Sequence, residues 1–321
     1  MRIATIIAFT VALGGSITMA QETSEPETKF DVRDEGAFGA LVPKDAKLKR
    51  LATGMQFTEG PVWVPHDGGY LIFSDIPADE LKRWSPQDGL TLFRKPSFHT
   101  NGNNLDLLGR LISCQHGSRT VTVTEREGDV RTIAETYNGK KLNSPNDLVC
   151  RKDGTIWFTD PTYGIKKDQQ EQPGQFVYRL DSKTGAITSL IEDFDQPNGL
   201  CFSPDEKKLY VADSGKPRHI RVFDIAEDGK SVANGKVFCQ IDKGGPDGIR
   251  CDSAGNVWSS AGDGVHIFAP DGTLLGKILV PETPANLCFG GEDGRTLFIT
   301  ARKSLYSIEL QIGGATTKPI K

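Results

Sequence analysis

The chain has no excess of positive charge. Its 321 residues include 38 Lys and Arg against 42 Asp and Glu, which gives a net charge of −4 at pH 7. Proteins that bind nucleic acids or anionic membranes usually carry strongly basic patches. The charge balance therefore gives no sign of a nucleic-acid partner or of an anionic membrane surface as a partner.

Sustained helical periods and long apolar segments are also absent. The apolar run Ile3–Leu13 is too short to span a bilayer. Arg2 precedes it and the small residues of Thr18–Ala20 follow it, so residues 1–20 are typical of a secretory signal peptide. No Cys lies near the cleavage point, which argues against a lipoprotein. We expect an exported protein, periplasmic or secreted, without membrane contact after cleavage.

Motifs of several enzyme classes are missing. No Ser nucleophile elbow appears, and the Gly-rich segments do not follow a phosphate-loop pattern. The 6 Cys residues have neither CxxC nor zinc spacing. Cys150, Cys201, Cys251 and Cys288 lie inside apolar, strand-like segments, so we interpret them as buried small hydrophobic residues. Disulfides between repeats are the alternative, because export would allow them.

What the chain does contain is an internal repeat. Its 35 Gly and 18 Pro indicate many turns. The clearest copies open with Pro145–Leu148, Pro197–Leu200 and Pro246–Ile249, and each continues through a turn into a second apolar run. Fixed-period similarity of this kind is the signature of a repeat architecture.

Three weaker copies extend the register, and the copies are 38 to 52 residues apart. The first position of the six copies is occupied by Glu59, Asn101, Asn146, Asn198, Asp247 and Ala285. This period is typical of one four-stranded blade of a β-propeller. We therefore predict an all-β, six-bladed β-propeller with four-stranded antiparallel blades as a single domain over residues 37–321. Residues 21–36 are polar and acidic, and we expect a flexible leader there.

Two features of the sequence indicate how the propeller closes and where a site lies. The segment Lys47–Ala52 alternates polar and apolar residues before the first repeat. We expect it to complete the last blade beside the C-terminal strands, because such closure removes free sheet edges. The longer linkers Pro161–Gly174 and Gly215–His219 interrupt the regular spacing, and loops of that kind often cover a site at one face of a scaffold.

The first positions of the repeats predict a metal site. Equivalent positions in a propeller lie at equivalent radius, so these residues form a ring around the axis, and five of the six carry a side-chain oxygen. Carboxylate and amide oxygens suit a hard cation, Ca²⁺ above all. The alternative is that these residues only form turns, which explains Asn and Asp well but Glu59 poorly. Glu59 and Asp247 would be costly neighbours without a cation.

Two histidines lie near the predicted ring. His99 precedes Asn101 by two residues and can reach the same face. His116 lies at the far end of its strand, where we interpret it as structural.

Several ordered motifs give the sequence a wider resemblance. They are Phe57–Trp63, His99–Gly102, Gln115–Gly117, Leu142–Asp147, Phe158–Pro161, Pro197–Gly199 and Pro246–Gly248. Together they closely resemble the bacterial gluconolactonases of the senescence-marker-protein/regucalcin-like group, over about residues 37–310. The members of that group are six-bladed propellers.

The resemblance implies one divalent metal near the axis, usually Ca²⁺, with Zn²⁺, Mn²⁺ or Mg²⁺ as alternatives, and hydrolysis of a sugar lactone. It also implies roles for individual residues. The expected metal ligands are Glu59, Asn198, Asp247 and Asn146, the expected substrate-binding residues are His99, Asn101 and Asn146, and the expected acid/base is Asp247. Vertebrate members carry an Arg two residues before the equivalent of Asn146, where it contacts the sugar. Here that position is Ser144.

The ion would polarise the lactone carbonyl, and Asp247 would take a proton from the attacking water. Two rival interpretations stay open at this point. One is a paraoxonase-like hydrolase of other lactones or esters. The other is a non-catalytic propeller that binds a sugar or a protein and uses calcium as a structural staple.

Overall fold

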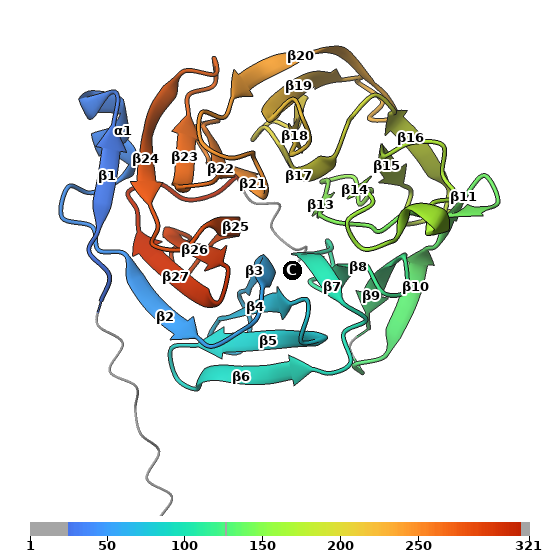
Figure 1. The fold of residues 1–321 in the computed structure, drawn as a ribbon, viewed down its shortest axis with the longest axis horizontal. Helices are drawn as coiled ribbons and strands as arrows, with labels where there is room; N and C mark the ends of the chain where they lie inside the picture. Colours follow the sequence, from blue (N-terminus) through green and yellow to red (C-terminus); the bar gives the residue numbers. More distant parts are fainter. Residues whose placement is uncertain (1–24, 126, 316–321) are drawn as a thin grey trace, which may run out of the picture.

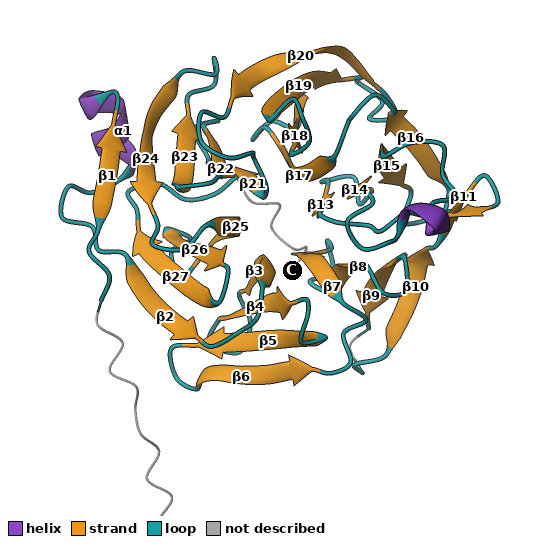
Figure 2. Ribbon diagram, viewed as in Figure 1, coloured by secondary structure: helices purple, strands orange, loops and turns teal. Residues whose placement is uncertain are grey.

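Six antiparallel sheets form a ring around a central axis (Figure 1). The computed structural model describes residues 25–125 and 127–315. The predicted signal peptide lies outside these residues. Within the described part, helical structure is limited to α1 (Glu35–Leu41) and the short 3₁₀ turn η1 (Lys167–Gln169), as Figure 2 shows. No helix there is long and apolar enough to cross a membrane.

Each sheet is one blade, and its strands run in chain order from the axis outward. Blade 1 contains β3 (Thr58–Val64), β4 (Tyr70–Asp75), β5 (Glu80–Ser85) and β6 (Gly89–Arg94). Blade 2 contains β7 (Thr100–Leu105), β8 (Leu111–Gln115), β9 (Thr120–Thr124) and β10 (Val130–Ala134). Blade 3 contains β13 (Leu148–Cys150), β14 (Ile156–Asp160), β15 (Phe176–Leu180) and β16 (Ile187–Ile191), and a small hairpin, β11 (Thr136–Tyr137) and β12 (Lys140–Lys141), precedes it.

The second half of the ring repeats the arrangement. Blade 4 contains β17 (Pro197–Phe202), β18 (Lys208–Asp213), β19 (His219–Ile225) and β20 (Val232–Gln240). Blade 5 contains β21 (Ile249–Cys251), β22 (Val257–Ser260), β23 (Gly264–Phe268) and β24 (Leu274–Leu279). Blade 6 contains β25 (Pro284–Gly290), β26 (Thr296–Ala301) and β27 (Ser304–Glu309). The predicted six-bladed β-propeller is confirmed.

The fourth strand of blade 6 comes from the other end of the chain. Strand β2 (Lys49–Thr53) pairs antiparallel with β27, from Lys49 opposite Ser307 to Thr53 opposite Ser304 (Figure 1). The predicted closure by Lys47–Ala52 is therefore confirmed within a residue or two. It joins the two ends of the repeat array and covers β27, which would otherwise be the edge strand of blade 6.

The predicted flexible leader is wrong for its second half. Strand β1 (Lys29–Val32) pairs with β24 and adds a fifth strand to blade 5. Helix α1 follows, capped by the Asp34 carboxylate, which accepts a hydrogen bond from the Ala37 backbone N–H at 2.9 Å. Phe38 of this helix is buried against blade 5 and lies 5.6 Å from the ring of Phe30. These few apolar residues are enough to hold the segment against blade 5. The prediction of a flexible leader missed them because the residues around them are polar and acidic.

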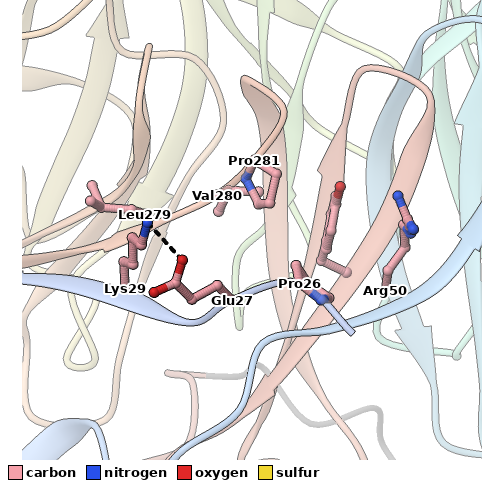
Figure 3. A pocket seen from close by; sticks show the side chains of 8 residues that line it. Pro26, Glu27, Lys29, Arg50, Leu279, Val280 and Pro281 are labelled. Carbon is pink, nitrogen blue, oxygen red and sulfur yellow. Dashed lines mark ion pairs between the residues drawn. The ribbon is translucent and has the colours of Figure 1, made fainter. Parts of the chain in front are cut away.

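Two cavities flank the fold away from the ring of repeat positions. A cavity of about 440 Å³ lies between the N-terminal segment and blades 5 and 6, where Lys29 pairs with Glu27 at 2.8 Å near Arg50 (Figure 3). A larger rear cavity of about 1080 Å³ lies at the far ends of the innermost strands. It is lined in part by Cys150, Cys201, Cys251 and Cys288. All 6 Cys lie in the described part, are buried and form no disulfide, which confirms the interpretation of these four as buried side chains.

Candidate functional site

The first positions of the repeats all lie where an innermost strand begins. Glu59, Asn101, Asn198 and Ala285 are each the second residue of their strand, and Asn146 and Asp247 each precede theirs by two residues. Glu59, Asn101, Asn146, Asn198 and Ala285 are 3–5% exposed, whereas Asp247 is partly exposed. Because most of these residues lie within strands, turn formation alone does not account for them.

Hydrogen bonds between blades hold these positions next to one another. The backbone carbonyl of Asn146 accepts from Gly102 at 2.8 Å, and that of Asp247 accepts from Gly199 at 3.1 Å. The carbonyl of Asn198 accepts from the Thr159 hydroxyl at 2.8 Å. Each blade thus fixes the corresponding residue of the next blade. The structure brings Asn101, Asn146, Asn198 and Asp247 together in chain order around the axis.

The glycine that follows several ring positions is required by this close approach. A Cβ on Gly60 would lie 2.0 Å from the Asn101 carbonyl oxygen, and one on Gly199 would lie 2.3 Å from that of Asp247. Both distances are far below van der Waals contact, so only glycine fits there. The recurring Asn-Gly and Asp-Gly pairs reflect packing between blades.

Two blades replace this glycine with a polar residue, and their side chains meet at the axis. Asp147 comes from blade 3 and Asn286 from blade 6, and the Asn286 Nδ2 donates to the Asp147 Oδ2 at 3.3 Å and to the Glu59 Oε2 at 3.0 Å. Arg250 donates to the Asp147 Oδ2 at 3.1 Å. The sequence analysis missed these three residues. Asp147 and Asn286 could have been recognised in the sequence, because they replace the glycine that other repeats have at this position.

The charged forms of the two ring carboxylates, Glu59 and Asp247, are destabilised by their surroundings. Burial raises the pKa of Glu59 to about 7, and the charge of Asp147 adds to this effect. Burial also raises the pKa of Asp247 well above its ordinary value, with further contributions from Glu59 and Asp147. Neither carboxylate has a basic side chain paired with it among the described ion pairs. A cation placed between them would favour their charged forms.

Asn101 presents an unpartnered oxygen in the same place. Its Oδ1 is buried without a hydrogen-bond partner, and its Nδ2 lies 3.3 Å from the Nε2 of His116. Burial lowers the pKa of His116 to about 4, so this imidazole is neutral at pH 7. His116, which was interpreted as structural, therefore lies beside the ring residue Asn101. Strand β8 runs antiparallel to β7, which brings its far end back to the ring face.

His99 lies at the rim of the site. Its side chain is exposed, and its Nδ1 lies 2.9 Å from the carbonyl oxygen of Ile76. The residue has a positive φ of 51°, and the Asp79 carboxylate accepts its backbone N–H at 2.8 Å. The structure therefore holds this loop in a defined conformation beside Asn101.

The long linker after β14 brings one side chain, that of Tyr163, close to the ring residue Asn198. Its Tyr163 hydroxyl donates to the Gln196 Oε1 at 3.1 Å and lies within reach of the Asn198 and Ser214 side chains. Sequence reasoning named the loop but not this residue, because the contact joins blades 3 and 4.

Carboxylates at the end of the second strand hold the segments that lead into the ring. Asp75 accepts the backbone N–H groups of Gln56 and Phe57, and Asp213 accepts those of Asp195 and Gln196. In blade 3 the Asp160 carboxylate likewise accepts the Asn143 N–H at 2.7 Å. The repeated Asp at this position was a further signal in the sequence. These residues fix the backbone before Glu59, Asn146 and Asn198.

The donor set fits a hard cation. The described residues contain no cluster of three or more His, Cys, Asp or Glu that could hold a metal. The ring instead combines two carboxylates with amide oxygens, one of which is buried without a partner. Such all-oxygen sets suit Ca²⁺, which accepts amide and carboxylate ligands together.

Comparisons with known proteins place the chain in a family. The chain is 34% identical to a gluconolactonase of Zymomonas mobilis, over 89% of this chain and 86% of that one. It matches a solved gluconolactonase from Xanthomonas campestris with a TM-score of 0.82 and 33% identity, over 89% of this chain and 98% of that chain.

A calcium-binding regucalcin from Agrobacterium tumefaciens shares the fold, with a TM-score of 0.71 at 22% identity, over 84% of this chain and 96% of that chain. The family model described as the SMP-30/Gluconolactonase/LRE-like region matches residues 57–303. The chain belongs to the SMP-30/gluconolactonase/LRE-like family.

Proposed function

We propose that this protein is a lactonase that hydrolyses a sugar lactone of the gluconolactone type to the aldonic acid, in a metal-dependent reaction. The gluconolactonases among its relatives support the reaction class. The observation that carries the proposal is the pair of strained carboxylates, Glu59 and Asp247, held in one ring with the unpartnered oxygen of Asn101. The signal-like start of the chain supports action outside the cytoplasm.

Glu59, Asn146, Asn198 and Asp247 would hold the divalent ion. Ca²⁺ is favoured by the all-oxygen donors and by the calcium-binding regucalcin of the same fold, and Zn²⁺, Mn²⁺ and Mg²⁺ are the alternatives. When bound, such an ion polarises a carbonyl group and stabilises the negative charge that forms on its oxygen.

Differences in exposure assign the two carboxylates to different tasks. Glu59 is enclosed, and its Oε2 accepts hydrogen bonds from the Gly60 N–H at 2.7 Å and from Asn286. Asp247 is partly exposed and can therefore contact both water and substrate. In our proposal the Asp247 carboxylate takes a proton from the attacking water and returns it to the ring oxygen as the C–O bond of the lactone breaks.

The remaining ring residues would bind the substrate. The free Oδ1 of Asn101 can accept a sugar hydroxyl, and the neutral His116 beside it limits how the amide can turn. Asn146 of the next blade and His99, two residues before Asn101, would contact other hydroxyl groups. These contacts orient the lactone over Asp247.

The test is hydrolysis of glucono-1,5-lactone, followed by proton release from the purified protein. Activity should vanish on chelation, return with Ca²⁺ or another of the four ions, and fall on the order of 100-fold or more in Glu59→Gln. Glu309→Gln, at the exposed end of β27, is the matched control and should keep full activity.

Two results would count against the proposal. Full lactonase activity in Asp247→Ala would exclude the acid/base role. Ions that raise the melting temperature of the protein without supporting hydrolysis would indicate that the metal is a structural staple.

A further inference from the structure

Ser144 is closed off from the ring face. It is fully buried, its hydroxyl donates to the Pro161 carbonyl at 2.6 Å, and the same oxygen accepts the Gly164 N–H at 2.9 Å. Its own backbone N–H donates to Pro161 as well, at 3.1 Å. Both hydrogen-bonding functions of this side chain are used within the protein. Because Ser144 is also fully buried, a substrate cannot reach it.

The loop that Ser144 anchors presents a different side chain at the site. Gly164 packs so tightly on this side that a Cβ there would lie 2.6 Å from the Cβ of His116 and 2.9 Å from that of Ser144. Tyr163, the residue just before Gly164, is 45% exposed. The loop is thus fixed at its base, while the Tyr163 side chain extends from it.

The phenol of Tyr163 lies over the neighbouring blade. Its hydroxyl donates to the Gln196 Oε1 at 3.1 Å and reaches the side chains of Asn198 and Ser214. Gln196 in turn is held by Asp213, which accepts its backbone N–H at 2.9 Å. A residue from blade 3 is thereby held beside Asn198 of blade 4, one of the ring residues.

We propose that Tyr163 is a specificity-determining residue that selects polyhydroxylated lactones by hydrogen bonding to a ring hydroxyl of the substrate. This inference rests on the proposed function. The phenol has one proton and two acceptor lone pairs. While it donates to Gln196, it can accept a hydrogen bond from a substrate hydroxyl in place of its contacts with the Asn198 and Ser214 side chains. Sites that pair with a hydroxyl discriminate against analogues that lack it.

A purely structural role for Tyr163 predicts a different pattern. If the hydroxyl only tethered the loop, its loss would disturb every substrate to a similar extent. Direct contact with a sugar hydroxyl affects only substrates that carry one. The ratio between two lactones therefore separates the two roles.

The experiment compares the full chain with Tyr163→Phe on glucono-1,5-lactone and on δ-valerolactone, which has the same ring without hydroxyl groups. We expect kcat/KM for gluconolactone to fall about five- to tenfold, as for the loss of one net hydrogen bond, while kcat/KM for δ-valerolactone stays within about twofold. Binding of D-gluconate, measured by calorimetry, should weaken by a similar factor.

Tyr137→Phe is the matched control. Its hydroxyl contacts the Ser189 hydroxyl at 3.1 Å in the outer part of blade 3, away from the ring, so it should change neither lactone. Equal losses on both lactones in Tyr163→Phe, or no loss on either, would overturn the inference. A wild-type chain that hydrolysed neither lactone would contradict the proposed function instead. Gluconate binding would still test Tyr163, because an unchanged Kd in Tyr163→Phe overturns its role.

Discussion

At the scale of single residues, Asp160 is a buried carboxylate whose charged form lowers the stability of the folded protein. Its Oδ2 accepts the Asn143 N–H, but its Oδ1 is buried without a partner. Burial raises its pKa from 3.8 to about 7. Between these two values the folded protein holds a proton that the unfolded chain has released, so the stability falls as the pH rises through this window.

We expect Asp160→Asn to remove this dependence. From pH 4 to pH 8 the wild type should lose on the order of 1–4 kcal/mol more of its unfolding free energy than the variant. Urea unfolding at a series of pH values measures the difference. Asp271→Asn, on an exposed turn, controls for the substitution itself. A variant with the same pH slope as the wild type would show that Asp160 does not titrate in this window.

Some residues of the site could be predicted from the sequence repeat, and others could be recognised only in the folded structure. The ring positions could be predicted because each recurs at a fixed place in its own repeat. Four other residues could not be assigned a place, because their contacts cross the axis or join different blades: Asp147, Asn286, Arg250 and Tyr163. Such contacts depend on three-dimensional placement, which no local pattern contains.

At the scale of elements, the innermost strands depend on the glycines between blades. The Gly199 N–H donates to the Asp247 carbonyl, and a Cβ at Gly199 would lie 2.6 Å from the Ile249 nitrogen. Both contacts involve backbone atoms of blade 5, which cannot move aside as a flexible side chain could. The junction between β17 and β21 is therefore intolerant of any larger residue.

Gly199→Ala should destabilise the protein by about 1–3 kcal/mol, as overpacking of a close contact does, and should lower lactonase activity by displacing Asp247. Denaturant unfolding and the rate on gluconolactone check the two effects. Gly39→Ala in α1 is the comparison, because a Cβ there has nothing within 4 Å and favours the helix. Equal stability in the two variants would contradict the packing argument.

Most elements followed from alternating apolar residues between turn signals. Two exceptions were β1 and α1, whose apolar residues are few and lie in a polar, acidic stretch. Strand β1 acquires its structure from the edge of β24, and α1 from the place that Phe38 occupies on blade 5. Their stability comes from a distant partner, so local composition was a poor guide.

At the scale of the whole molecule, the ring is held closed by β2 and extended by β1, and the two strands should differ in importance. A chain that begins at Asp34 lacks β1, but blade 5 keeps four strands like its neighbours. We expect it to fold, with a melting temperature lowered by roughly a few degrees. A chain that begins at Gly54 lacks β2, which leaves blade 6 with three strands and an open edge.

We expect this shorter chain to aggregate or stay unfolded, because the unpaired edge of β27 can no longer close the ring. Size-exclusion chromatography and circular dichroism distinguish the two truncations. A folded, monomeric chain beginning at Gly54 would show that strand closure is dispensable.

The side chains that meet beneath the ring have a consequence for turnover. Glu59, Asn286 and Asp147 are at most 3% exposed and join blades across the axis, and Arg250 separates them from the rear cavity. These side chains lie between the ring and the rear cavity, so we expect substrate to enter and product to leave from the ring face. The acid that is formed must leave by the route through which the next lactone enters. Competition between product and substrate for that single entrance is thus built into the architecture.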